Sequence, residues 1–145
     1  MFDALRKLFS AEKTEDEADG IPPRTAAAAL LVEIALADGV YAGVEADQIK
    51  TCLKQAFSLS DAEAAVMMEK AESLAENAVD HHRFTQSVKF GLPKEERLTL
   101  MENMWRVVLA DGEREAHEDM MLRRLAPLLG LTDRERAEAR QRAAG

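Results

Sequence analysis

Residues 33–39 have the sequence EIALADG, and residues 106–112 have the sequence RVVLADG. The shared Leu-Ala-Asp-Gly segments lie 73 positions apart, and Glu45 and Glu118 follow their glycines at the same distance. Self-similarity at a fixed period indicates repeated structural units that bury their apolar faces against each other. The sequence therefore predicts two related halves, each with a helix, a tight Asp-Gly loop and further helices.

Apolar residues recur three or four positions apart along the chain from residue 24 onward, and no segment alternates as a strand does. The expected core stripes are Ala27, Leu30, Leu31 and Ile34; Ile49, Cys52, Leu53 and Ala56; Ala64, Met67, Met68, Ala71 and Ala75; Phe84 and Val88; Met101, Met104, Trp105 and Val108; and Leu122, Leu125 and Leu129. This pattern predicts an all-α fold of about seven helices, with two pseudo-repeated helical halves packed into one bundle-like domain.

Capping signals also match between the halves. Ser60 with Glu63 and Thr132 with Glu135 have the spacing of the capping box, in which each side chain bonds the other residue's backbone N–H. Their offset is 72 rather than 73, which places a slip of one residue near residues 57–59. The second box predicts a last helix from about Asp133 into the arginine-rich end.

The first 22 residues differ from the rest of the chain. Phe2, Leu5, Leu8 and Phe9 share one face of a short predicted helix, and the polar, acidic residues 12–20 form a tether. A helix this short needs a surface to lie on, and its own domain, a membrane surface and a partner's groove all qualify. We expect the helical domain to span residues 23–145.

Composition restricts the class of function. The 27 acidic and 19 basic side chains give a formal net charge of -8, which opposes a nucleic-acid backbone. A protein partner is expected and nucleic acid is not. One cysteine, Cys52, excludes an internal disulfide and fits the cytoplasm, and its stripe position predicts a buried thiol rather than a nucleophile. We expect a cytoplasmic protein, with peripheral membrane contact through Phe2, Leu5, Leu8 and Phe9 as the alternative.

Asp38 and Asp111 fall at the C-terminal ends of predicted helices, where the negative end of the helix dipole disfavours an anion. Each aspartate can turn forward to cap the next helix, with its glycine ending the first helix in the left-handed conformation. Alternatively, the carboxylates and the exposed carbonyl groups together bind a hard cation such as Ca²⁺ or Mg²⁺.

The spacing from Gly39 to Glu45 and from Gly112 to Glu118 equals that between the sixth and twelfth positions of a calcium-binding EF-hand loop. The first and third positions of such a loop would be apolar residues here, so neither loop is an EF-hand and any cation site is incomplete. The second loop has more oxygen ligands. The candidate metal ligands are Asp38, Glu45, Asp111, Glu113, Glu115 and Glu118.

The paired Ala-Asp-Gly loops, each with Glu six residues after its glycine, resemble the TerB tellurite-resistance family and TerB-like domains over about residues 24–143. Residues 95–98 (EERL), Trp105 and residues 109–113 (LADGE) are similar to small bacterial members with two such halves. The resemblance implies an all-helical fold, no known catalysis, acidic residues suspected of binding divalent cations, and a role near membrane-linked stress responses.

Other chemistry-bearing residues favour structural roles. His81 and His82 are adjacent on a predicted helix start and point about 100° apart, so they cannot chelate one zinc ion together. Trp105 lies on a core stripe, whereas Tyr41 lies in a loop between glycines. The leading hypothesis is a non-catalytic interaction or sensor module. The alternative is a metal-dependent enzyme, or an enzyme accessory subunit, with a cryptic carboxylate site.

Overall fold

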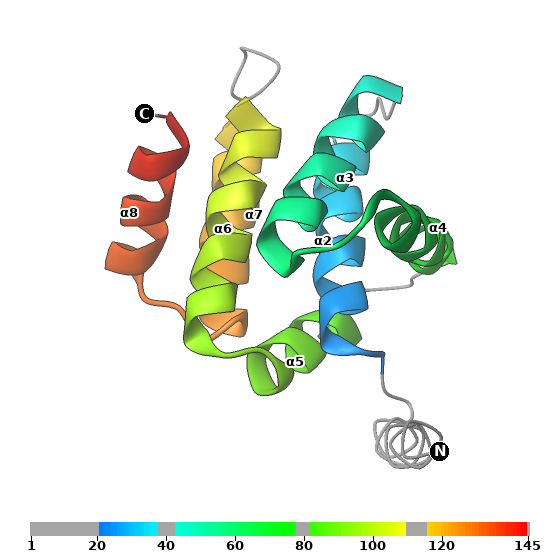
Figure 1. Ribbon diagram of the computed structural model, residues 1–145. Coiled ribbons are helices and arrows are strands. Elements are labelled where there is room, and N and C mark those ends of the chain that lie inside the picture. The colour runs from blue at the N-terminus through cyan, green and yellow to red at the C-terminus, as the bar shows by residue number, and fades with distance from the viewer. Residues whose placement is uncertain (1–20, 38–42, 78–81, 110–115, 145) are drawn as a thin grey trace.

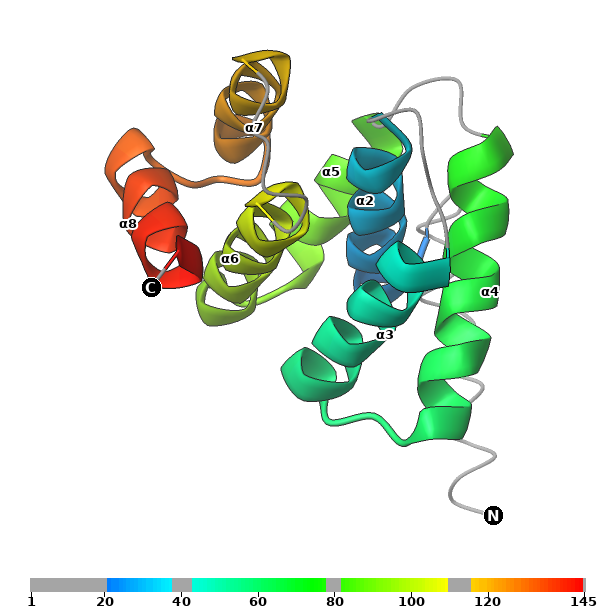
Figure 2. The ribbon, with the colours of Figure 1, turned by 90° about the horizontal axis from the view of Figure 1, so that it is seen from above.

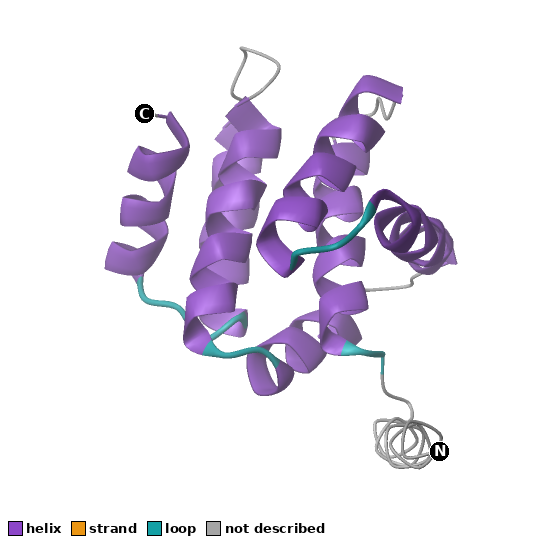
Figure 3. Ribbon diagram, viewed as in Figure 1, coloured by secondary structure: helices purple, strands orange, loops and turns teal. Residues whose placement is uncertain are grey.

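The computed structural model describes residues 21–37, 43–77, 82–109 and 116–144 of the chain. These residues form seven helices and no strand, which confirms the predicted all-α class and helix number (Figures 1 and 3). The helices are α2 (Pro23–Ala37), α3 (Gly43–Phe57), α4 (Asp61–Asn77), α5 (His82–Gly91), α6 (Lys94–Leu109), α7 (Ala116–Leu128) and α8 (Asp133–Ala144). The last helix begins at the predicted residue.

Helix α2 is the centre of the bundle. Residues 26–32 are each at most 1% exposed, because α3, α4, α5 and α6 all contact this helix. The sequence predicted one apolar stripe on α2, but the structure buries every side of these two turns. Four consecutive alanines, residues 26–29, explain the difference, since small side chains let neighbouring helices approach from several directions.

The other helices bury one face each, as predicted. Trp105 of α6 is 3% exposed and Cys52 of α3 is 7% exposed, so both lie in the core as expected. Of the predicted stripe residues, only Ala56 and Met67 are half-buried, and both still pack against the core. The buried side chains form one cluster that joins all seven described helices.

Three kinds of helix contact are shared by the two predicted halves. Helix α4 packs on α2 and α8 packs on α6, while α2 and α6 contact each other in the middle (Figure 2). Helix α3 contacts α2 and α4, and α7 contacts α6 and α8 in the same way. This order agrees with two related halves built around α2 and α6.

The ends of α3 and α7 are closed by the same backbone motif. Leu59 donates its backbone N–H to the Lys54 carbonyl at 3.0 Å, and Leu131 donates to the Ala126 carbonyl at 2.8 Å. In both motifs the preceding residue is left-handed, with φ of 56° at Ser58 and 77° at Gly130. In both motifs the paired residues of the two halves are 72 positions apart, from Lys54 and Ala126 onward. The one-residue slip therefore lies before Lys54 rather than at residues 57–59.

Both predicted capping boxes form at the starts of α4 and α8. The Glu63 N–H donates to Ser60 Oγ at 3.1 Å, and the Ser60 N–H donates to Glu63 Oε1 at 2.9 Å. The Glu135 N–H donates to Thr132 Oγ1 at 3.0 Å, and the Thr132 N–H donates to Glu135 Oε1 at 2.9 Å. Each box satisfies two backbone donors that the first turn of a helix leaves unpaired.

Polar side chains fix the connections at the end of the bundle where α2 and α6 begin. Arg97 of α6 donates from Nη1 to the Leu129 carbonyl at 2.9 Å and from Nε to the Leu92 carbonyl at 3.1 Å. The Ser87 hydroxyl of α5 donates to the Ile21 carbonyl. These bonds tie α6 to the end of α7, and α5 to the chain just before α2.

Candidate functional site

The helix ends that flank both Asp-Gly segments lie at one end of the bundle. In Figure 1, α2 and α6 finish at the upper end, and α3 and α7 begin there. Helix α2 contacts α6, and α3 contacts both of them, so three of these four helices are direct neighbours. The fold therefore gathers two helix C-termini and two helix N-termini, which have opposite partial charges. We refer to this region as the Asp-Gly end.

Four of the six predicted cation ligands, Asp38, Asp111, Glu113 and Glu115, lie outside the described residues. Helix α2 ends at Ala37, directly before the first aspartate, and α6 ends at Leu109, two positions before the second. The predicted placement of both aspartates at helix C-termini therefore agrees with the described helix bounds.

The other two predicted ligands lie in described backbone, although their side chains are outside the described part. Glu45 is the third residue of α3, and Glu118 is the third residue of α7. A carboxylate in the first turn of a helix is stabilised by the positive end of the dipole. The equal spacing in the sequence thus corresponds to an equal position in the two helices.

The EF-hand comparison fails in the structure for the reason expected from the sequence. Ile34 and Val107, at the first ligand position of such a loop, are 2% and 3% exposed within regular helices. A buried isoleucine or valine supplies no oxygen ligand from its side chain. Any cation at this end must therefore bind through the residues that follow the two helices.

A charged network lies along the second half of α6. Glu102 accepts a hydrogen bond from Arg106 at 2.5 Å and one from Arg142 of α8 at 3.1 Å. Helix periodicity alone does not indicate this network, because Glu102 and Arg142 are 40 positions apart.

Burial raises the pKa of the Cys52 thiol, and the positive charge of Arg106 opposes that shift in part. The thiol is therefore protonated at neutral pH, and a thiol is a weaker nucleophile than a thiolate.

No group of three or more His, Cys, Asp or Glu side chains that could hold a metal ion occurs among the described residues. Helix α5 begins at His82, which agrees with the helix start predicted there, while His81 and Tyr41 lie outside the described part. The side chain of His117 is also outside it.

Two buried polar atoms lack a partner among the described residues, namely Glu96 Oε1 and Trp105 Nε1. The other oxygen of Glu96 lies 3.6 Å from Arg24, whose guanidinium stacks 4.8 Å from the ring centre of Phe57. These contacts join α2, α3 and α6. The Trp105 ring is covered by Arg140 of α8 at 5.4 Å. Both clusters hold helices together.

The fold and the Asp-Gly end define a class: an all-helical module in which the helix ends that flank the two Asp-Gly sequences lie at one end of the bundle. The family model described as "Tellurite resistance protein TerB" matches residues 24–141, which is most of the chain. The chain belongs to this family, as its loop sequences predicted. Comparisons with curated proteins and with solved structures found no match.

None of the described helices is long and apolar enough to cross a lipid bilayer. Helix α2 has the most apolar sequence, with a single charged residue, Glu33, after Arg24, but it is only 15 residues long. A spanning helix needs about 20 residues. Its apolar character is explained by its central position in the bundle.

Proposed function

We propose that this TerB-family protein is a non-catalytic interaction and sensor module whose Asp-Gly end weakly binds a divalent cation, Ca²⁺ or Mg²⁺. The observation that carries this proposal is the convergence of the ends of α2 and α6 with the starts of α3 and α7. The family's link to tellurite resistance suggests a role in a bacterial stress response.

The chemistry of this end suits a hard cation. The last carbonyl groups of a helix have no partner within the helix and carry partial negative charge, which attracts a cation. The acidic side chains next in sequence add oxygen ligands of the type that Ca²⁺ and Mg²⁺ prefer. Because the two loops lack the first ligands of an EF-hand, we expect water to complete the coordination and the affinity to be low.

The second loop is the stronger half of the proposed site. Its sequence from Asp111 to Asp119 contains five acidic residues, whereas residues 40–43 of the first loop are Val, Tyr, Ala and Gly. More carboxylates bind a divalent cation more tightly, since each adds an attractive charge. We therefore expect variants in the second loop to weaken binding more than matched variants in the first.

Thermal unfolding tests the proposal. A ligand that binds only the folded state at ten times its Kd stabilises it by about 1.4 kcal/mol. For a domain of this size that gain raises the Tm by about 3 to 6 °C. Millimolar Ca²⁺ or Mg²⁺ should give such a rise over EDTA, and Asp111→Asn with Glu118→Gln should abolish most of it.

A matched control separates binding from general charge effects. Glu69→Gln with Glu76→Gln removes two exposed carboxylates from α4, away from the Asp-Gly end, and should leave the cation-dependent rise unchanged. Equal melting curves with EDTA and with either cation would refute cation binding. The acids would then act as helix caps or as a docking surface for a basic protein.

The enzyme alternative makes a different prediction. A metal-dependent hydrolase should turn over a generic substrate such as p-nitrophenyl phosphate when Mg²⁺ or Mn²⁺ is present. We expect no turnover above that of free metal. Activity that disappears in the Asp111→Asn, Glu118→Gln variant would contradict the non-catalytic proposal and locate a catalytic site at the Asp-Gly end.

A further inference from the structure

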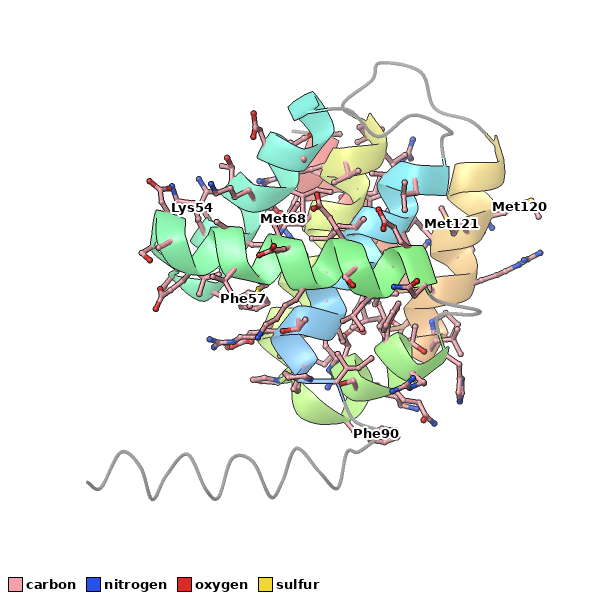
Figure 4. The ribbon with its side chains drawn as sticks, turned by 90° about the vertical axis from the view of Figure 1, so that its right-hand side faces the viewer. Lys54, Phe57, Met68, Phe90, Met120 and Met121 are labelled. Atoms are coloured by element: carbon pink, nitrogen blue, oxygen red, sulfur yellow. The ribbon has the colours of Figure 1, made fainter. Side chains whose placement is uncertain are left out.

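An open groove of about 550 Å³ lies between the beginning of α2 and helix α4. Figure 4 looks onto α4, with the beginning of α2 beneath it. Ile21 and Pro22 line the groove on one side, and Val66, Lys70, Ser73 and Leu74 of α4 line it on the other. The α4 residues follow one another at helical spacing, so they form a continuous face along the groove.

This face of α4 carries apolar surface that the fold leaves uncovered. Val66 is 53% exposed, although α4 buries its core residues Ala64, Met68, Ala71 and Ala75 on another side. Pro22 is also exposed, and Leu74 is only half-buried. An apolar side chain placed between Val66 and Pro22 would remove both from water.

The chain itself supplies an occupant within reach. Phe2, Leu5, Leu8 and Phe9 lie upstream of the groove, and eleven residues separate Phe9 from Ile21, which lines it. Eleven extended residues span about 36 to 40 Å. Helix α4, with 17 residues, is about 25 Å long. The tether therefore reaches every position along the groove.

Charge favours the same occupant. Helix α4 carries five acidic side chains and one basic one, namely Asp61, Glu63, Glu69, Glu72, Glu76 and Lys70. The segment at residues 1–10 carries Arg6 and Lys7 against Asp3. A basic amphipathic segment beside an acidic helix is held by attraction between opposite charges as well as by apolar contact.

We infer that residues 2–9 dock into the groove between the beginning of α2 and α4 of the same chain. Phe2, Leu5, Leu8 and Phe9 cover Val66 and Pro22, and Arg6 and Lys7 lie beside Glu69, the acidic residue that lines the groove. Linkage through a short tether makes this contact intramolecular at an effective concentration in the millimolar range, so a small interface suffices. The contact is independent of cation binding at the Asp-Gly end.

Disulfide trapping tests the docking in the full-length chain. Cys52 is replaced by alanine, Leu5 by cysteine, and a second cysteine is introduced as Val66→Cys in the groove or as Met120→Cys on α7. The two sites are matched in side-chain exposure, since Val66 is 53% and Met120 is 50% exposed. Under mild oxidation we expect the cysteines at positions 5 and 66 to form an intramolecular disulfide at least about tenfold faster than those at positions 5 and 120. Docking raises the effective concentration of the first pair only.

Equal rates for the two pairs would overturn the inference. Disulfides that form only between molecules, at a rate that rises with protein concentration, would also overturn it and assign the groove to a second copy. Fast disulfide formation between positions 5 and 66 in buffer alone, at a rate that dilution does not change, supports the inference. Docking that requires vesicles of anionic phospholipid would contradict the inference and favour a membrane surface.

Limited proteolysis gives an independent measurement without added cysteines. Trypsin cleaves the peptide bonds after Arg6 and Lys7, and docking should protect these bonds from cleavage. Val66→Asn should speed this cleavage several-fold, because docking would bury the new amide group without a hydrogen-bond partner. Met120→Asn is the control of similar exposure and should leave the rate unchanged. Equal cleavage rates in the parent and in both variants would refute the docking even if the trapping variants fold poorly.

Discussion

Helices α4 and α8 occupy equivalent places in the two halves but are held by different forces. Helix α4 buries Ala64, Met68, Ala71 and Ala75, whereas Ala139 is the only buried residue in the described part of α8. Helix α8 is instead attached through polar contacts, including Lys94 to Glu135 at 2.8 Å and Arg142 to Glu102 at 3.1 Å. Exposed ion pairs are weak. Apolar burial therefore holds α4 in place more than it holds α8.

The same difference separates the central helices. Helix α2 has neighbours on every side, whereas α6 keeps one edge, at Glu102 and Arg106, that is only half-buried. The Trp105 ring of α6 is covered by Arg140 of α8. Helices at matching positions in the two predicted halves are thus held by different contacts.

The largest expected effect comes from the centre of α2. Leu31→Ala removes a completely buried side chain and should lower the free energy of unfolding by about 2 to 5 kcal/mol. Arg134→Ala, at an exposed position of α8, should change it by about 0.5 kcal/mol or less. Urea denaturation measures both. Similar losses in the two variants would contradict the complete burial of the centre of α2.

The left-handed caps give a sharper comparison at equivalent positions. Gly130→Ala puts a Cβ at φ 77° and 2.7 Å from Arg97 Nη1, and should cost about 1 to 2 kcal/mol. Ser58→Gly relieves the strain of a non-glycine residue at φ 56° and should stabilise the protein by about 0.5 to 1 kcal/mol. Denaturation midpoints that move in the same direction for both variants would show that the two caps are not equivalent.

The two capping boxes should contribute equally to the free energy of unfolding. Ser60→Ala and Thr132→Ala each remove one side-chain acceptor at a helix start and should cost about 1 kcal/mol. Ser73→Ala, within α4 and exposed, is the control and should be close to neutral. The Glu135 partner also carries a pKa lowered by Lys94 and Thr132, which fits its ionised role in the box.

The smallest effect is expected from the terminal segment. Deleting residues 1–20 should leave one cooperative unfolding transition and lower the free energy of unfolding by less than about 1 kcal/mol, because the described residues from 21 onward already form one hydrophobic cluster among themselves. Thermal and urea unfolding followed by circular dichroism measure this. Loss of cooperativity would show that the segment belongs to the core and that the predicted boundary near residue 23 is wrong.

Much of the fold was predictable because local signals agree with one another. The helix periodicity, both capping boxes and the start of α8 at Asp133 follow from side-chain spacing alone. The complete burial of α2 was not predictable, since it depends on how four other helices pack around residues 26–32. A run of alanines in an apolar helix is the signal that could have indicated it.

The candidate sites depend on tertiary arrangement to different degrees. The spacing from glycine to glutamate predicted equivalent positions for Glu45 and Glu118, and both are third in their helices. The groove beside α4 was missed, because Val66 stands among polar residues on the side away from the core stripe. Sequence periodicity identifies a core face well, but an exposed apolar residue gains meaning only from its neighbours in space.

Calcium binding to the full-length chain, measured by isothermal titration calorimetry, tests the proposed function most directly. We predict saturable binding with a Kd of about 0.1 to 1 mM. Asp111→Asn with Glu118→Gln should weaken it by about tenfold or more, or about 1.4 kcal/mol. Asp38→Asn with Glu45→Gln should weaken it less, and Glu69→Gln with Glu76→Gln should not change it. Absence of saturable binding of either Ca²⁺ or Mg²⁺, or equal binding in all three double variants, would contradict a cation site at the Asp-Gly end.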